Sequence, residues 1–373
     1  MRKQRYLGAI FAALLTVVVS GCGTASTNSQ SSSAQTSTNN GAKTNKVIIG
    51  VYGGSWEQEI RSAALNDFQK RTGIKVVVVP GTDADWFAKV RAANGKNPPY
   101  DILVLQPDTI NRLEGANLLQ PLDSKHVPNL AHLYASATDH FTKDGKVYAA
   151  GFSYGQLGIA YRKDYVHVPP SKWTNLWNPR YKGHVAVSPL TYAAGLQFFA
   201  GIVHATGGQL SNPSDVQKAF QKLGQLRNNV VAYPSDPGTI QTLLQRGNAW
   251  LVPEWDGRAY ALQQQGLDVG FVYPKDGPVA AISSWAIMKG SPNLANAYKL
   301  LNYLLSPQVE GKFAQQSFYG MSNKDVQYSS DFKKKIHVGD AYYNKLLWVD
   351  YSVVTPNLAQ WTNEWSQVMG EGK

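Results

Sequence analysis

Ser153 has the most recognisable chemical context in the chain. Gly151-Phe152-Ser153-Tyr154-Gly155 matches the G-x-S-x-G string of serine hydrolases, in which a strand precedes the nucleophile and a helix follows it at once. Here an apolar run at residues 157–161 follows, and that run predicts a strand. The chain is therefore not predicted to be an enzyme, and an exported serine hydrolase using Ser153 stays open as an alternative.

Metal, cofactor and nucleotide chemistry have no recognisable pattern. The seven His residues lack H-E-x-x-H or another ligand spacing, and a single Cys forms neither an intramolecular disulfide nor a Cys metal site. No Walker A string occurs, so any ATP-driven process requires separate subunits. We expect no cofactor and no metal.

Length and charge exclude further classes. With 373 residues the chain exceeds what one hydrophobic core usually organises, so two domains or a two-lobed body is expected. The net charge of +11 is spread along the sequence. The short basic run at residues 331–335 reads as a solvated helix face, and nucleic acid is not an expected partner.

The N-terminus has the anatomy of an export signal. Arg2, Lys3 and Arg5 precede an apolar run at residues 6–19, and Val19-Ser20-Gly21-Cys22 resembles the lipobox of bacterial lipoproteins. We expect a signal peptide at 1–21, lipidation of Cys22, and a flexible polar tether at 22–45. The protein is then lipid-anchored on the outer face of the cell membrane, or on the periplasmic side of a membrane. An ordinary signal peptide with a coincidental cysteine is the alternative.

The body opens with a strand–helix–strand unit. An apolar run at 47–51 predicts a strand, and a helical pattern on Trp56, Ile60 and Phe68 follows it. Ser55 and Gln58 have the spacing of a capping box, and Gly73 marks the helix end. The continuous Val and Ile of 74–79 predict a parallel strand covered on both faces. A helix at about 85–93 and a strand at 102–105 continue the alternation.

A second series of elements begins near Gly155. Strands are predicted at 157–161, 185–188, 230–233, 250–253, 269–273 and 281–288, and helices at 192–204, 240–246 and 294–305. The C-terminal part, with Trp348, Trp361 and Trp365, is expected to be helical. The fold class is therefore α/β with mostly parallel sheets.

Several segments in this order give the chain a family resemblance. They are FQKRTGIKV (68–76), YDILVLQPD (100–108), SKWTNLWNPRYKG (171–183), NVVAYPSD (229–236), EWDG (254–257) and LLNYLLSPQVEGKFAQQSFYGMSN (300–323). The chain resembles the type II solute-binding proteins of bacterial ABC importers, in particular the spermidine/putrescine-binding branch. The Trp-rich segment ending in Tyr-Lys-Gly is the most specific.

The resemblance implies two α/β lobes joined by crossing hinge strands, with the solute between them. Lobe one is expected at 47–150 plus 281–318, and lobe two at 155–277 plus 325–373. The implied partners are a small polar organic solute and an ABC transporter permease with separate ATPase subunits. A ligand-sensing partner of a membrane kinase is a third possibility that the sequence does not separate from transport.

The expected solute site collects residues from both lobes, since ligands lie at the carboxyl ends of parallel strands. The candidates are Tyr52, Gly53, Gly54, Ser55, Gln106, Asp108, Tyr154, Ser188, Thr191, Tyr192, Trp255, Asp256, Ser283, Trp285 and Tyr319. Without the resemblance, such Tyr and Trp residues are more often part of a core than of a ligand site.

The chain departs from polyamine binders in its acidic residues. Those proteins hold amines with carboxylates where this chain has Ser188-Pro189-Leu190-Thr191 and Ile282-Ser283-Ser284. A long polycation is then an unfavourable ligand, because cation–π contacts of about 0.5 to 2 kcal/mol offset little of its desolvation.

Backbone donors at Gly53, Gly54 and Ser55 suit an anionic group, unless Ser55 only caps its own helix. Asp108 and Asp256 can pair with one cationic group. A small zwitterion or a neutral polar solute stacked on Trp255 fits these residues, and a polyamine receptor with a rearranged site is the alternative.

Overall fold

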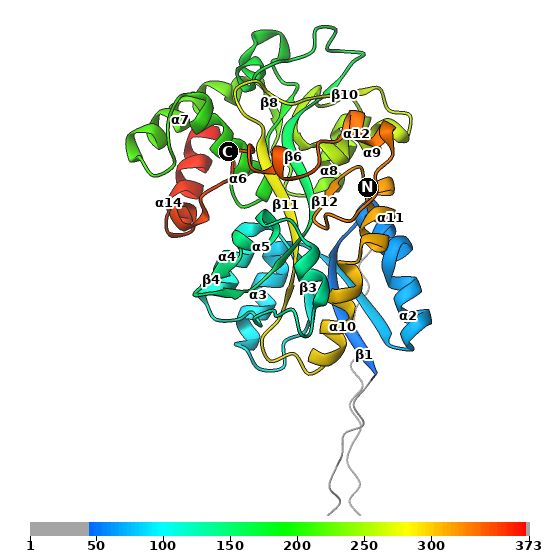
Figure 1. Ribbon diagram of the computed structural model, residues 1–373. Coiled ribbons are helices and arrows are strands. Elements are labelled where there is room, and N and C mark those ends of the chain that lie inside the picture. Colours follow the sequence, from blue (N-terminus) through cyan, green and yellow to red (C-terminus); the bar gives the residue numbers. More distant parts are fainter. Residues whose placement is uncertain (1–44, 371–373) are drawn as a thin grey trace, which may run out of the picture. The chain divides into compact units, whose positions relative to one another are not determined.

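A computed structural model of the chain describes residues 45–370 (Figure 1). Among these residues, ten strands form one mixed sheet in the order β2-β1-β3-β11-β6-β9-β7-β8, with β10 and β12 paired to β6. The predicted signal segment, Cys22 and nearly all of the tether lie outside the described residues.

The first part of the sheet is built as the sequence predicts, with three exceptions. β1 (Lys46–Tyr52) pairs in parallel with β2 (Lys75–Gly81) and with β3 (Ile102–Leu105). The helical segment between β1 and β2 consists of α1 (Ser55–Ile60), a π-helical turn η1 (Arg61–Leu65) and α2 (Asn66–Thr72).

The predicted capping box of Ser55 and Gln58 is wrong, because Gly54 at φ 73° is the N-cap and Ser55 is already helical. Strand β2 is not covered on both faces, since it forms the edge of the sheet and its residues are half-buried or exposed. Helix α3 (Asp83–Ala93) begins earlier than predicted, after Thr82, whose hydroxyl accepts from the Asp85 amide.

The second part of the sheet contains short strands and their connecting helices. Its strands are β7 (Val185–Ala186), β8 (Val230–Ala232), β9 (Leu251–Trp255) and β10 (Val269–Val272). Its helices are α6 (Ala193–Ala205), α7 (Pro213–Leu226), α8 (Pro237–Gln245) and α9 (Asp256–Gln264). Strand β7 pairs in parallel with β8 and β9.

Two long strands connect the two parts. β6 (Ala150–Arg162) and β11 (Val279–Ile287) pair antiparallel and run side by side through the middle of the described residues (Figure 1). β11 also pairs with β3, and β6 pairs with β9, so each strand belongs to both parts. A register shift between Ser283 and Ser284 interrupts their pairing. The strand β12 (Gly320–Met321) adds a third crossing of the chain beside β6.

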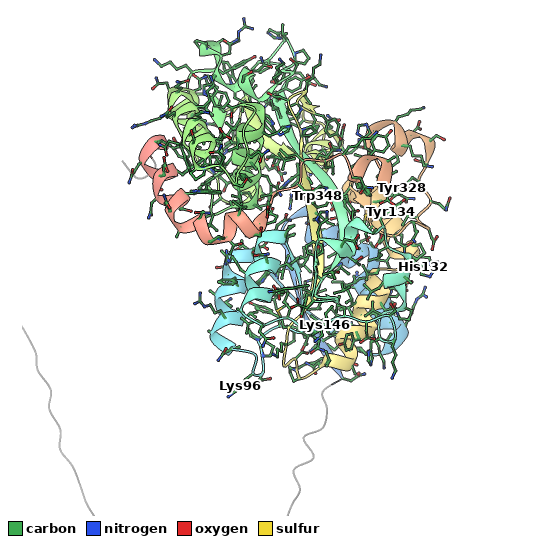
Figure 2. All side chains as sticks on the ribbon, turned by 60° about the vertical axis from the view of Figure 1, so that its left-hand side comes forward. Lys96, His132, Tyr134, Lys146, Tyr328 and Trp348 are labelled. Carbon is green, nitrogen blue, oxygen red and sulfur yellow. The ribbon has the colours of Figure 1, made fainter. Side chains whose placement is uncertain are left out.

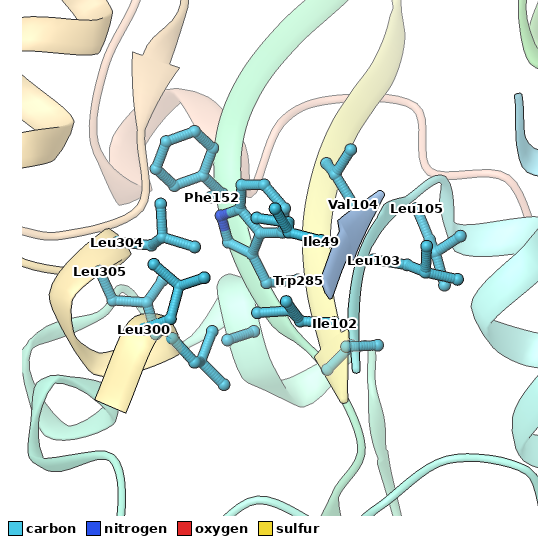
Figure 3. Packing of buried hydrophobic residues seen from close by; sticks show 14 of the residues in the cluster. Ile49, Ile102, Leu103, Val104, Leu105, Phe152, Trp285, Leu300, Leu304 and Leu305 are labelled. Atoms are coloured by element: carbon cyan, nitrogen blue, oxygen red, sulfur yellow. The ribbon is translucent and has the colours of Figure 1, made fainter. Parts of the chain in front are cut away.

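Buried apolar side chains gather on both sides of this crossing. The largest cluster contains Ile49, Ile102, Phe152, Trp285 and Leu300, which interdigitate between β1, β3, β6, β11 and helix α10 (Leu294–Leu304) (Figure 3). A second cluster contains Leu157, Phe199, Leu251, Trp361 and Trp365, and a smaller third one surrounds Ala160 and Val252. The described residues nevertheless belong to one compact unit.

The C-terminal segment contacts both clusters. Val326, Phe332, Ile336 and Tyr343 belong to the first cluster. Val349 and the four buried residues of α14 (Tyr351–Met369), which are Val354, Trp361, Trp365 and Met369, belong to the second. Between them Trp348, labelled in Figure 2, stacks on His140 with ring centroids 3.9 Å apart. The segment therefore passes from one side of the crossing to the other.

The remaining elements are short or lie at the periphery. They are α4 (Pro107–Gly115), η2 (Pro128–His132), α5 (Ser136–Asp139), β4 (Thr142–Lys143), β5 (Lys146–Val147), η3 (Trp173–Trp177), η4 (Pro179–Tyr181), η5 (Arg227–Asn229), α11 (Pro307–Ser317), α12 (Ser330–Lys335) and α13 (Asp340–Tyr343). The Lys residues of α12 are exposed, as its charge pattern indicates. No helix of residues 45–370 is long and apolar enough to span a bilayer.

Candidate functional site

A cavity of about 410 Å³ lies where the two parts of the sheet meet. The first part contributes the segments that follow β1, β2 and β3. The second part contributes the N-terminal ends of α6, α8 and α9, and the crossing strands β6 and β11 supply the floor. The lining residues are Tyr52, Gly53, Trp56, Gly81, Thr82, Asp83, Ala84, Gln106, Asp108, Ser153, Gly155, Thr191, Tyr192, Ala193, Ser235, Asp236, Pro237, Trp255, Arg258, Ala281, Ser283 and Tyr319.

One end of the cavity is acidic. Asp83 Oδ1 accepts a hydrogen bond from the Gln106 backbone N–H at 2.9 Å, and Gln106 Nε2 donates to the hydroxyls of Tyr52 and Ser283 at 3.3 Å each. Burial, followed by the neighbouring Asp108 carboxylate, raises the pKa of Asp83 to about 7. Burial also raises the pKa of Asp108, against the effect of Arg112. Two carboxyl groups that repel each other form a site for a cationic group, which relieves the repulsion.

The other end carries aromatic rings and a guanidinium. Trp255 packs edge-to-face on Tyr192 with centroids 5.7 Å apart, and its Nε1 donates to Gln197 Oε1 at 2.7 Å. The Arg258 guanidinium, on the first turn of α9, lines the same cavity and is half-buried. Burial opposes its charge, but Tyr319, Tyr192 and nearby carboxylates hold the pKa of Arg258 above its ordinary value.

Two glycines let the Tyr319 ring reach the cavity. A Cβ on Gly155 would lie 2.8 Å from Tyr319 Cε1, and a Cβ on Gly257 would lie 2.5 Å from the same atom. Both distances are shorter than van der Waals contact, so only glycine leaves room for the ring. The EWDG segment therefore positions an aromatic wall as well as Trp255.

We predict that Gly257→Ala weakens solute binding without unfolding the protein. The new methyl group displaces Tyr319 and also lies 2.8 Å from the Ser317 carbonyl oxygen, and the helix preference for alanine of about 1 kcal/mol offsets part of the cost of these contacts. Affinity is to be measured by calorimetric titration and stability by urea unfolding. Gly224→Ala, also within a helix, is the matched control, because its Cβ would have its nearest neighbour at 3.7 Å. Equal affinities of the Gly257 variant and wild type would show that the ring does not contact solute.

Nine of the predicted site residues line the cavity. They are Tyr52, Gly53, Gln106, Asp108, Thr191, Tyr192, Trp255, Ser283 and Tyr319. The structure brings them together from six separate stretches of the chain. Their contact with a solute stays a prediction.

Six predicted residues lie outside the cavity lining. Gly54 and Ser55 precede and begin α1, and Ser55 lines a separate surface depression. Tyr154 stacks on Tyr343 with centroids 3.8 Å apart, because successive residues of β6 face opposite sides of the sheet. Ser188 is buried behind the start of α6.

Asp256 and Trp285 lie outside the cavity lining and make contacts that stabilise the fold. Asp256 accepts hydrogen bonds from the amides of Gln156 and Gly257 at 3.2 and 2.8 Å and from the Tyr273 hydroxyl at 3.1 Å. Its carboxylate therefore ties α9 to β6. Trp285 is fully buried beneath Trp56, which itself lines the cavity.

Sequence reasoning missed Asp83 and Arg258, two ionisable side chains that line the cavity. Asp83 follows Thr82 at the start of α3, so the threonine before an acidic helix start was an available signal. Arg258 directly follows the EWDG segment. No local pattern indicates that either side chain turns into a cavity. Trp56, Thr82, Ser153, Ser235 and Asp236 also line it.

Ser153 does not have the geometry of a hydrolase nucleophile. It lies within the continuous strand β6, so the required strand–turn–helix is not formed. No cluster of three or more His, Cys, Asp or Glu side chains suited to a metal ion occurs in residues 45–370.

We predict that the stability of the unliganded protein falls as the pH rises from 6.5 to 8. Burial raises the pKa of Glu254, Asp256 and Asp83 to about 7, far above their ordinary values. The folded state then holds protons that the unfolded state has lost, so this contribution is present at low pH and is lost as the pH passes 7. The expected loss is about 2 to 3 kcal/mol. His140, whose pKa is lowered by burial, acts in the opposite sense only below about pH 6.5.

Urea unfolding at a series of pH values tests this dependence. Glu254→Gln is expected to flatten the curve, because it removes one of the titrating groups. A stability that is constant or rises between pH 6.5 and 8 would contradict the assignment.

The chain matches known solute-binding proteins over most of its length. Residues 63–339 match the family model for bacterial extracellular solute-binding proteins. The chain is 26% identical over 278 residues to the spermidine/putrescine-binding periplasmic protein of Escherichia coli K12, covering 73% of this chain and 77% of that protein.

Solved structures show the same fold. An ABC transporter substrate-binding protein from Bradyrhizobium japonicum USDA 110 has a TM-score of 0.73 at 22% identity, covering 87% of this chain and 99% of that one. The periplasmic binding protein MotA from A. tumefaciens B6, solved in complex with glucopine, has a TM-score of 0.74 at 17% identity with the same coverage. The expected α/β fold of the type II periplasmic binding proteins is thereby confirmed. The sheet is mixed, where the sequence predicted mostly parallel sheets, because β6 and β11 pair antiparallel with their neighbours.

Proposed function

The chain belongs to the bacterial extracellular solute-binding proteins, and we propose that it captures a small polar organic solute in the cavity between Tyr52 and Trp255. It is a non-catalytic component of an ABC importer, related to polyamine-binding proteins. The single observation that carries the proposal is the cavity itself. Its walls come from both parts of the sheet, and they combine carboxylates, a guanidinium and five large aromatic rings, on Tyr52, Trp56, Tyr192, Trp255 and Tyr319.

The proposal includes two lobes that close on the solute. We assign 47–150 plus 281–318 to lobe one and 155–277 to lobe two, with β6 and β11 as crossing strands. The packing of the tail supports a change to the expected boundary: residues 326–343 go with lobe one and residues 349–370 with lobe two. Hinge closure around a ligand is a common motion in proteins of this class.

The proposed partners follow from the family. A permease with separate ATPase subunits would receive the solute from this extracytoplasmic protein. A lipid on Cys22 and the polar tether at 22–45 would keep the binding domain near that permease. Attached acyl chains would make the association with the membrane stable.

A polyamine receptor with a rearranged site is the second candidate. The carboxylates of Asp83 and Asp108 favour it, because they supply the negative charge that an amine requires. The Arg258 guanidinium in the same cavity disfavours a second ammonium group.

A thermal-shift screen tests the proposal. The solutes should include polyamines, amino acids, phosphorylated metabolites and sugars, and a binder raises the melting temperature by mass action. At a solute concentration of 100 Kd the expected stabilisation is about 2.7 kcal/mol. The proposal requires at least one saturable binder with a 1:1 ratio in calorimetry. If no class binds, solute capture by this cavity is contradicted.

A further inference from the structure

Arg258 has an unusual position for a half-buried guanidinium. It lines the cavity, and no hydrogen bond or ion pair joins it to another residue in the described part of the chain. Glu254 and Glu59 are within electrostatic range but make no salt bridge to it. A guanidinium presents five N–H donors in a planar fork that matches a carboxylate. Because the Arg258 guanidinium lines the cavity without a hydrogen-bonded partner, it can bind an anionic group of the solute.

Two of the carboxylates near Arg258, those of Glu254 and Asp236, accept hydrogen bonds from other groups. Glu254 Oε1 accepts the Trp255 amide at 2.8 Å, and the side chain is only 2% exposed. Asp236, which also lines the cavity, accepts the amide and hydroxyl of Thr239 at 2.9 and 2.7 Å and so caps α8. These hydrogen bonds hold both carboxylates in place, and neither carboxylate makes a hydrogen bond or ion pair with Arg258.

Negatively charged side chains line the other end of the cavity. Asp83 and Asp108 lie at the starts of α3 and α4. Their electrostatic neighbours are each other, Tyr52, Tyr351 and Arg112, whose guanidinium lies 4.0 Å from Asp108 Oδ2. Arg258 belongs to α9 and interacts with Tyr319 and Tyr192. The two charged ends thus belong to different parts of the sheet. The Gln106 Oε1 atom, which has no partner among the described residues, adds an acceptor at the acidic end.

We infer that the cavity selects a solute that carries a cationic nitrogen at one end and a carboxylate at the other. The nitrogen lies between Asp83 and Asp108, the carboxylate pairs with Arg258, and Trp255 and Tyr319 enclose the carbon chain between them. This assignment rests on the proposed function, whose site it uses. A diamine would place its second ammonium against Arg258, and a dicarboxylate would place its second anion against Asp83 and Asp108.

Three series of matched compounds test the inference on the purified full chain. They are ω-amino carboxylates, α,ω-diamines and α,ω-dicarboxylates with unbranched chains of four to eight carbons, so members of equal length differ only in their end groups. Calorimetric titration should show that the best-fitting amino carboxylate binds at least about tenfold more tightly than the diamine or dicarboxylate of its length.

Variants assign each end. Arg258→Gln is expected to weaken the amino carboxylate at least about tenfold and to leave the diamine unchanged or tighter, and Arg258→Glu is expected to reverse the preference toward the diamine. Asp108→Asn is expected to weaken both nitrogen-containing series but not the dicarboxylate. Arg246→Gln, at the exposed end of α8, is the matched control and should change nothing.

Three results would overturn the inference. The first is tighter binding of a diamine or dicarboxylate than of the matched amino carboxylate by wild type. The second is an equal loss of all three series in Arg258→Gln, which would indicate a structural role only. The third is no binding in any series. None of these results contradicts the proposed function, because binding of a sugar or a polyamine in the wider thermal-shift screen would still support solute capture.

Discussion

Trp255→Ala is expected to weaken solute binding by about 30-fold or more. The indole lines the cavity, is 8% exposed and is fixed by its hydrogen bond to Gln197 and its contact with Tyr192. Removing an aromatic wall of this size costs about 2 kcal/mol of contact with the solute. Because about 1.4 kcal/mol corresponds to a factor of ten, calorimetric titration should detect the loss easily.

Two further variants separate contact from general damage. Trp255→Phe keeps a ring but loses the bond to Gln197, so its affinity should fall between those of wild type and the alanine variant. Trp250→Ala removes an indole that stacks on His184 and Tyr165 outside the cavity, and it should leave affinity unchanged. Wild-type affinity in Trp255→Ala would remove this residue from the site.

Trp285→Ala is expected to destabilise the protein by about 3 to 5 kcal/mol. The side chain is 0% exposed and packs on Trp56 and Phe152, with centroids 5.8 and 5.5 Å away, in the core shown in Figure 3. Truncation leaves a cavity that the surrounding rings fill only in part. Urea unfolding measures the loss.

Measuring both stability and solute affinity in the Trp285 variants shows whether this tryptophan supports the core or contacts the solute. Trp285→Phe should recover more than half of the lost stability, because it restores most of the buried apolar volume. A Trp285→Ala protein with wild-type stability and no solute binding would mean that the indole faces the solute, as the family resemblance first implied.

The sequence predicted the regular elements well where hydrophobic periodicity decided them. The fully apolar run Ile102–Leu105 is a buried strand, and the apolar helix after Tyr192 is α6. The exceptions have local causes that periodicity does not contain. Gly54 adopts a positive φ and takes the N-cap position from Ser55. The Val-rich strand β2 lies at the sheet edge, and a sheet's strand order is set by distant pairings.

The candidate site was only partly predictable because side-chain direction depends on tertiary geometry. Alternation along β6 places Ser153 and Gly155 in the cavity lining and turns Tyr154 away. On β11, Ser283 lines the cavity, whereas Trp285 lies deeper, beneath Trp56. Asp83 and Arg258 were missed because a helix start has no sequence signal for the direction in which its first side chains point.

A crystal structure of the full chain with a solute identified in the thermal-shift screen is the most direct test of solute capture. The account predicts density for the solute inside the cavity, in contact with Trp255 and with at least one of Asp83, Asp108 and Arg258. Solute density on the outer surface, with this cavity filled only by water, would contradict it.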